Sequence, residues 1–201
     1  MCSSDLVIQS LRRIYLQINQ SIMTAYVKSL RSVKCSGSII VKGKPTIITI
    51  GRGDITFGQN VQLNSINYGY HCNMHSPVKL YSEGAEAHIR IGDNTRIEGA
   101  CIHAVNESIT IGDRCLIAAN VQIINSSGHS PSFDNPEQRP TSKGDSSSIV
   151  IDNDVWLCIN SIILPGTKIG RGSIISAGSV VKGIIPPMCI ATGNPARVIE
   201  R

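Results

Sequence analysis

The residue best suited to acid–base chemistry is His129, in the segment Asn125-Ser-Ser-Gly-His-Ser-Pro. An imidazole has an unperturbed pKa of about 6.5, so it can take a proton from a hydroxyl group at neutral pH. The residues from there to Ser148 are mainly Pro, Ser, Asn, Asp, Gly and charged residues, which predicts a long loop. Loops held by a rigid scaffold often carry function, so we predict a functional role for His129 rather than an ordinary surface position.

Trp156 is the single tryptophan and lies just after this loop. Aromatic residues make up only 4% of the chain, so we predict that Trp156 forms a ligand wall or a subunit contact rather than core. Cys158 lies two residues further on and could act as a covalent nucleophile. No histidine adjoins Cys158 in the sequence to act as its base, so this remains the lesser alternative.

The element that must position these residues is a repeat of six. From residue 151 onward an aliphatic residue recurs at every sixth position: Ile151, Leu157, Ile163, Ile169, Ile175 and Val181. Smaller residues stand four positions later in each hexad: Val155, Ser161, Thr167, Ser173 and Ser179. Parts of this register occur earlier, at Ile91 and Ile97 and again at Ile111, Ile117 and Ile123. A period of six fits neither a helix nor a flat sheet, but it fits a triangular parallel β-solenoid with three hexads per coil.

The register also assigns positions to two histidines. Counting forward from Ile123 makes residue 129 the next inward position, so His129 replaces an aliphatic residue where the loop leaves the coil. The same count places His103 at an inward position. We predict that His103 is either packed at a corner or in contact with an acceptor substrate.

The composition agrees with a β-rich chain. There are 32 Ile and 13 Val but only nine Leu, four of them in the first 30 residues, and β-branched side chains pack well on strands. No apolar run approaches the roughly 20 residues of a bilayer span. The seven Cys form no C-x-x-C pair and no signal peptide is visible, which predicts a cytoplasmic protein. The net charge of +5 is dispersed, favouring an anionic small ligand or a membrane surface over nucleic acid.

The chain divides into three parts. Residues 1–34 are predicted to form a helical segment, 35–183 a β-helix with extruded loops near 64–78 and 127–148, and 184–201 a C-terminal cap. The helix carries an apolar stripe at steps of three to four residues: Val7, Leu11, Ile14, Ile18, Ile22, Tyr26 and Leu30. We expect this amphipathic helix to pack on the body or on a neighbouring subunit. Peripheral association with a membrane surface is the alternative interpretation.

The hexads resemble those of the hexapeptide-repeat acyltransferases, with their motif [LIV]-[GAED]-x-x-[STAV]-x. The resemblance covers roughly residues 39–199 and implies an all-β fold, a left-handed parallel β-helix preceded here by the helix. The C-terminal stretches Gly178-Ser-Val-Val-Lys-Gly-Ile-Ile-Pro-Pro and Gly193-Asn-Pro-Ala-Arg-Val-Ile resemble the end signature of that family. The family acylates acceptors from acyl-CoA, so the resemblance implies acetyl-CoA as donor and requires no metal.

The loop is similar to the active-site loop of the sugar and polysaccharide O-acetyltransferases in that family. That likeness implies His129 as general base, Trp156 beside the thioester and the Ile159 N–H as an oxyanion donor. It also implies coenzyme A contacts, with Ala177 along the pantetheine and with Lys182 and Arg197 near the nucleotide phosphates. Candidate acceptor contacts are Asn125, Asp134, Arg139, His103 and Glu98. Cys158 stands where the family usually has Gly, and Glu98 where galactoside-type members have a sugar-binding Asn.

The resemblance further implies a homotrimer with active sites at subunit interfaces, acting on a glycan or small-molecule hydroxyl. The favoured acceptor is a sugar or a surface polysaccharide. Alternatives are a streptogramin-type antibiotic or other small-molecule acetyltransferase, a non-catalytic hexapeptide protein, or a metal-dependent enzyme like the hexapeptide-type carbonic anhydrase. His71, Cys72 and His75 could imitate a metal site. The anhydrase, however, needs a pair of His five residues apart, and neither His103 nor His129 has one.

Overall fold

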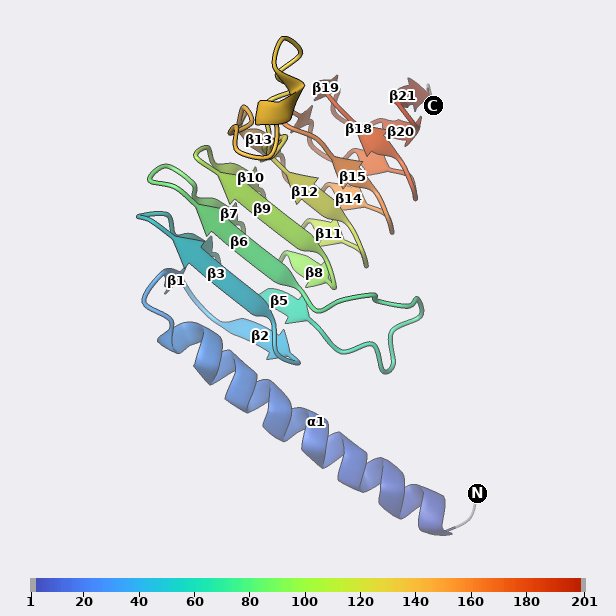
Figure 1. Ribbon diagram of the computed structural model, residues 1–201. Coiled ribbons are helices and arrows are strands. Elements are labelled where there is room, and N and C mark those ends of the chain that lie inside the picture. The colour runs from blue at the N-terminus through green and yellow to red at the C-terminus, as the bar shows by residue number, and fades with distance from the viewer. Residues whose placement is uncertain (1–2, 200–201) are drawn as a thin grey trace.

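The computed structural model describes residues 3–199. One helix, α1 (Ser3–Ser29), precedes a stack of short strands, and the chain passes through three sheets in turn (Figure 1). Apart from the last two strands of the chain, neighbouring strands in each sheet are three apart in the chain. For example, β10 (Ile109–Ile111) pairs in parallel with both β7 (Ile89–Ile91) and β13 (Ile149–Ile151). The chain therefore winds around a three-sided prism, which confirms the predicted parallel β-helix.

We call the three faces sheets A, B and C. Sheet A contains β1 (Val33–Cys35), β4 (Ile55–Phe57), β7 (Ile89–Ile91), β10 (Ile109–Ile111), β13 (Ile149–Ile151), β16 (Lys168–Ile169) and β19 (Ile184–Ile185). Sheet B contains β2 (Ile39–Lys42), β5 (Val61–Asn64), β8 (Arg96–Glu98), β11 (Leu116–Ile117), β14 (Trp156–Leu157), β17 (Ile174–Ile175), β20 (Ile190–Gly193) and β21 (Ala196–Ile199). Sheet C contains β3 (Thr46–Ile50), β6 (Lys79–Glu83), β9 (Cys101–Val105), β12 (Gln122–Ile124), β15 (Ile162–Ile163) and β18 (Val180–Val181).

The core is the aliphatic column that the hexads predicted. All six residues of the inward series from Ile151 to Val181 are buried, and so are the five smaller residues of the second series. Because every coil adds side chains of similar size at the same depth, the stack buries a continuous Ile/Val column without large aromatics. The six-residue repeat of the sequence therefore corresponds to the repeated layers of side chains in the core.

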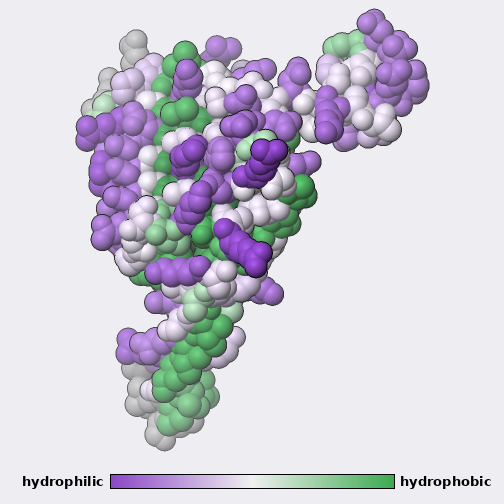
Figure 2. All heavy atoms as spheres, turned by 90° about the vertical axis from the view of Figure 1, so that its left-hand side faces the viewer, coloured by the Kyte–Doolittle hydropathy of each residue, from purple (hydrophilic) through white to green (hydrophobic). Residues whose placement is uncertain are grey.

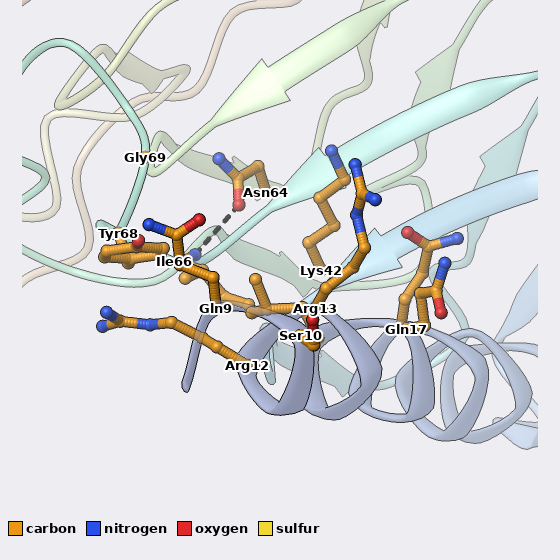
Figure 3. Close-up of a pocket in the computed structure, with 12 residues that line it drawn as sticks. Gln9, Ser10, Arg12, Arg13, Gln17, Lys42, Asn64, Ile66, Tyr68 and Gly69 are labelled. Carbon is orange, nitrogen blue, oxygen red and sulfur yellow. Dashed lines mark hydrogen bonds between the residues drawn. The ribbon is translucent and has the colours of Figure 1, made fainter. Parts of the chain in front are cut away.

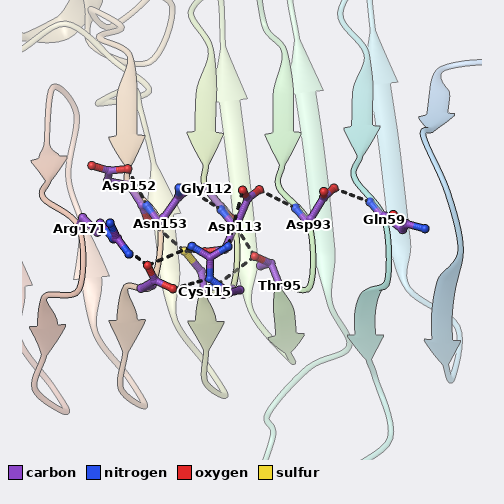
Figure 4. A network of polar contacts seen from close by, with 11 residues as sticks. Gln59, Asp93, Thr95, Gly112, Asp113, Cys115, Asp152, Asn153 and Arg171 are labelled. Atoms are coloured by element: carbon purple, nitrogen blue, oxygen red, sulfur yellow. Dashed lines mark hydrogen bonds and ion pairs between the residues drawn. The ribbon is translucent and has the colours of Figure 1, made fainter.

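At the corner between sheets A and B, Asp and Asn side chains form hydrogen bonds to the backbone of the neighbouring coil. Asp93 Oδ1 accepts a hydrogen bond from Gln59 N at 2.7 Å, and Asp113 Oδ1 accepts one from Asp93 N at 2.8 Å (Figure 4). Asp113 N in turn donates a hydrogen bond to Asn153 Oδ1 at 2.7 Å, so the side chains form a ladder along the corner. A Cβ at Gly112 would lie 2.4 Å from Asn153 Oδ1, so only glycine leaves room for the ladder between coils.

Two loops interrupt the prism at opposite edges of sheet C (Figure 1). Residues 65–78 connect β5 to β6, and residues 125–148 connect β12 to β13 and include the 3₁₀ turn η1 (Pro136–Gln138). The solenoid itself extends beyond the expected boundary at residue 184. β19 and β20 still pair in parallel with the coil before them, and only the antiparallel β21 ends the stack.

Helix α1 closes the N-terminal end of the prism. Val27 is fully buried, and Met23 and Leu30 pack against the same core. Asn19 Oδ1 accepts a hydrogen bond from Gly43 N at 2.9 Å, and Thr24 Oγ1 accepts one from Val41 N at 3.1 Å. These side chains cover the free edge of the first coil, where no strand is available to do so.

The expected packing of the apolar stripe on the body is wrong. Most of the stripe is more than half exposed, as is Ile18 at 54%, and the helix contacts the prism through its other face. Figure 2 shows hydrophobic side chains along the helix where it projects from the body. The interpretations that place a neighbouring subunit or a membrane on the stripe both remain. No helix among residues 3–199 is long and apolar enough to cross a membrane.

Candidate active site

The loop 125–148 begins and ends as a narrow hairpin at the edge of sheet C. An isolated antiparallel bridge joins Ser126 to Ser146, and Gly144 N donates to Gly128 O at 3.1 Å. Gly128 has φ of +77°, a left-handed conformation that favours glycine. This turn directs the next residue, His129, away from the prism.

His129 is exposed on the loop, so its expected inward position is wrong. The chain leaves the coil earlier than the count assumed, because the last residue facing the interior is the fully buried Asn125. Asn125 Oδ1 accepts a hydrogen bond from Val105 N at 2.7 Å, and its Nδ2 donates to Glu107 O at 2.7 Å. Asn125 thus anchors the base of the loop through the backbone of the preceding coil, and its side chain is not accessible to an acceptor.

The imidazole of His129 is oriented by a backbone carbonyl. Its Nδ1 lies 3.2 Å from Ser142 O. A carbonyl can only accept, so this hydrogen bond requires the proton on Nδ1 and leaves Nε2 of the neutral ring as an acceptor. An imidazole held in this way can accept a proton at Nε2 from a bound ligand. Nothing in the sequence marks Ser142, because its backbone rather than its side chain performs this role.

Asp134 and Arg139 lie on the same loop and are both exposed. Arg139 Nε donates to Pro131 O at 2.5 Å, and its guanidinium lies 6.0 Å from the centre of the Phe133 ring. Arg139 therefore orders the segment directly after His129. Asp134 makes no hydrogen bond or ion pair within residues 3–199, so its carboxylate is available to a ligand.

A second group of predicted residues lies on sheet B and at the corner between sheets B and C. Trp156 points outward from β14 and is 45% exposed. Ile159 follows at the corner, and Ala177 is exposed at the same corner of the next coil. Within the described chain, the backbone N–H of Ile159 donates no hydrogen bond, as an oxyanion donor requires. Burial raises the pKa of the Cys158 thiol, which lowers its thiolate fraction and makes it a poor nucleophile.

The two predicted phosphate ligands are on different faces of one chain. Arg197 is exposed on β21 and pairs in register with Thr192 of sheet B. Lys182 is exposed directly after β18, at the edge of sheet C from which the 125–148 loop also leaves. One chain therefore does not bring these two cations to a common phosphate site.

His103 faces outward, contrary to the register count. Ile102 takes the inward position, because the step from Ile97 is five residues instead of six. The His103 ring stacks on Tyr81 at a centroid distance of 4.4 Å, and burial lowers its pKa. His103 Nε2 is buried and, within residues 3–199, has no hydrogen-bond partner in this structure.

Glu98 lies at the other edge of sheet C, near the 65–78 loop. It is in register with Asn64 on β5, and its Oε2 is likewise buried without a hydrogen-bond partner among the described residues. Buried polar atoms of this kind are expected to find partners, so Glu98 and His103 are both suited to contact a polar ligand. In the part of the chain that the structure describes, no three metal-binding side chains come together, and His71, Cys72 and His75 form no such cluster.

The predicted site residues thus form two separate groups. His129, Asp134, Arg139 and Lys182 lie at or beyond the edge where sheet C meets sheet A. Trp156, Ile159, Ala177 and Arg197 lie on sheet B or at its corner with sheet C. The strands of sheet C separate the two groups. A three-sided prism of parallel hexad coils is the architecture of the hexapeptide-repeat class of proteins.

Comparisons with known proteins place the chain in the same class. The family model for the bacterial transferase hexapeptide matches residues 148–183, and that for the hexapeptide repeat of succinyl-transferase matches residues 88–124. WbbJ of Escherichia coli K12, named as a lipopolysaccharide biosynthesis O-acetyl transferase, is 36% identical over 142 residues, covering 68% of this chain and 72% of WbbJ. Galactoside O-acetyltransferase of the same strain is 37% identical over 124 residues, covering 62% of this chain and 58% of that protein.

A solved structure is also similar. The hexapeptide-repeat acetyltransferase of Vibrio cholerae O1 biovar eltor, complexed with acetyl coenzyme A, matches with a TM-score of 0.54 and 34% identity, covering 64% of this chain and 66% of that one. The chain therefore belongs to the hexapeptide-repeat acetyltransferases with a left-handed β-helix, and it is related to the sugar O-acetyltransferases.

Proposed function

We propose that the protein transfers an acetyl group from acetyl-CoA to a hydroxyl of a sugar or surface polysaccharide, with His129 as general base. The observation that carries this proposal is the hydrogen bond from His129 Nδ1 to Ser142 O, which leaves Nε2 free to accept a proton. The relationship to WbbJ and to galactoside O-acetyltransferase supports a sugar acceptor. The Vibrio cholerae structure, complexed with acetyl coenzyme A, supports the donor.

The transfer is direct. Nε2 of His129 removes the proton of the acceptor hydroxyl while the oxygen attacks the thioester carbonyl, forming a tetrahedral intermediate. The N–H of Ile159, which has no other partner in residues 3–199, donates to the oxyanion. The C–S bond then breaks, CoA leaves as the thiol with the proton that His129 carried, and the O-acetyl ester remains.

The remaining contacts divide between donor and acceptor. Trp156 forms a wall of the thioester site, the pantetheine arm passes Ala177, and Lys182 and Arg197 contact the nucleotide phosphates. Asp134, Arg139, His103 and Glu98 are acceptor contacts. Among the described residues, His103 Nε2 and Glu98 Oε2 have no hydrogen-bond partner, and His103 Nε2 lies 4.0 Å from Glu83 Oε2. Asn125 contributes by holding the loop, since its side chain is buried.

The complete site needs more than one chain. His129 and Trp156 lie on different sides of sheet C, so we infer a homotrimer in which His129 of one subunit meets Trp156 of its neighbour. The same arrangement would bring Lys182 of one chain near Arg197 of another. A cyclic assembly of this kind forms three equivalent sites.

The reaction is tested by release of free thiol from acetyl-CoA in the presence of a panel of sugars and oligosaccharides. We expect thiol release that depends on a hydroxyl acceptor, and an O-acetyl product detected by mass spectrometry. Acetyl transfer only to antibiotics, or activity that requires stoichiometric zinc or iron, would contradict the proposal. The protein without acceptor measures the background hydrolysis of the thioester.

The shared site is tested by mixing two inactive variants. His129→Ala lacks the base, and Ala177→Tyr blocks the pantetheine path with a bulky side chain at an exposed position. After dissociation and reassembly at equal amounts, about a quarter of the interfaces should combine an intact His129 with an intact Ala177, and activity should return to that level. Variants mixed without dissociation are the control. No recovery from verified mixed trimers would show that each chain holds a whole site.

A further inference from the structure

Helix α1 turns its apolar stripe away from the protein. Val7, Leu11, Ile14, Ile18 and Ile22 are each more than half exposed. At 100° per residue these positions centre about 150° around the helix from Met23 and Val27, which contact the core. The helix lies across the N-terminal end of the prism, so the stripe faces outward from that end (Figures 1 and 2).

The charges around the stripe are of one sign. Arg12 and Lys28 flank the stripe on either side, and the sequence from Val7 to Ser29 contains no Asp or Glu. A groove of about 660 Å³ lies between the helix and the 65–78 loop and is lined by Arg12, Arg13 and Lys42 (Figure 3). The Arg12 guanidinium also lies 3.4 Å from the centre of the Tyr68 ring.

We propose that α1 seats the protein on the surface of an anionic lipid bilayer. The stripe enters the boundary between headgroups and acyl chains, and the helix lies parallel to the surface. The flanking cations Arg12 and Lys28 bind anionic headgroups. An apolar face with aliphatic residues and a basic polar face is the pattern of an interfacial helix. The proposal is independent of the acetyl-transfer chemistry.

Charge favours a bilayer over a second copy of this chain as the partner. Two helices packed through their stripes would bring Arg12 and Lys28 of one copy toward the cations of the other. The sequence from Val7 to Ser29 has no acidic residue with which they could pair. An anionic surface neutralises these same cations, and each Lys or Arg near it adds to the attraction.

Co-sedimentation of the full chain with lipid vesicles tests the proposal. We expect binding to vesicles of phosphatidylglycerol and phosphatidylcholine, and weaker binding to phosphatidylcholine alone. Leu11→Asp should weaken binding at least tenfold, because a carboxylate replaces an apolar side chain that enters the bilayer. Leu11→Gln keeps helix propensity and should weaken it by less but measurably. Lys28→Gln should lose about fivefold on anionic vesicles only.

The matched control is Ile184→Asp, which adds the same charge at an isoleucine that is 76% exposed on sheet A at the far end of the prism. It should bind vesicles like the parent chain. Equal loss in Ile184→Asp and Leu11→Asp would overturn the proposal, since the effect would then be one of net charge. The proposal is also overturned if the parent chain ignores anionic vesicles while Leu11→Asp splits its oligomer in sedimentation velocity, because the stripe would then be an interface between copies.

Discussion

The His129→Ala protein is expected to fold normally and to lose acetyl transfer by about 10²- to 10⁴-fold in kcat, the usual contribution of a positioned general base. The imidazole is exposed on the loop and its one hydrogen bond is to Ser142 O at 3.2 Å, so its removal leaves no cavity in the core. Steady-state thiol release from acetyl-CoA with a working acceptor measures the loss. KM for acetyl-CoA should change little, because the base acts on the acceptor hydroxyl.

His75→Ala is the matched control. His75 is also an exposed histidine on an extruded loop, but at the opposite edge of sheet C. Its loss should leave kcat within about twofold, because no proton transfer is assigned to it and its backbone N–H, not its imidazole, is held by Asn120 Oδ1 at 2.8 Å. If His129→Ala kept the turnover of the parent protein, the base would have to be another group, and His103 with its buried Nε2 would be the next to test.

Asn125→Asp is expected to lower the free energy of unfolding by about 2–4 kcal/mol, although it changes one atom. Asn125 is fully buried, and its Nδ2 donates to Glu107 O at 2.7 Å. An ionised Asp would place an unpaired charge there and turn a donor into an acceptor that faces a carbonyl. Chemical denaturation at neutral pH measures the change, and Asn135→Asp, an exposed position on the loop, should change stability by less than about 0.5 kcal/mol.

The deficit of Asn125→Asp should depend on pH with a definite sign. Burial raises the folded-state pKa of the new carboxyl above its unfolded value of about 3.9. The full cost is therefore present above the folded-state pKa, and it disappears as the pH falls below the unfolded value. The protonated carboxyl can donate to Glu107 O as the amide did. A deficit that did not shrink with acid would mean that Asn125 acts through packing rather than through its hydrogen bonds.

The fold was predictable because each hexad contributes one aliphatic residue to the core. Every aliphatic residue from Ile151 to Val181 that the period assigned to the interior is buried there. The histidine of the loop was also predictable as a candidate, since a polar interruption of a regular repeat is visible without any structure. Its inward position was not correct, because the count assumed that the coil continued to residue 129.

The six-residue period could not predict local deviations from that period. The five-residue step from Ile97 to Ile102 turned His103 outward onto Tyr81, and the buried Asn125 ended the coil before the loop began. A single skipped residue in a strand reverses which face a side chain occupies, so a pattern read from one end accumulates such errors. His129 is oriented by the backbone carbonyl of Ser142, so no residue type in the sequence indicates this contact.

The sequence alone determined the three-sided β-helix, the two extruded loops and the candidate base, because each depends on spacing along the chain. Only the tertiary structure decided which predicted residues share an edge of the prism. It placed His129 and Trp156 on different sides of sheet C, and it turned the stripe of α1 outward. These facts depend on distances between coils and on which face of the helix covers the first coil, and periodicity within a segment contains neither. The candidate base could therefore be named from the sequence, whereas the separation of His129 from Trp156 across sheet C was visible only in the fold.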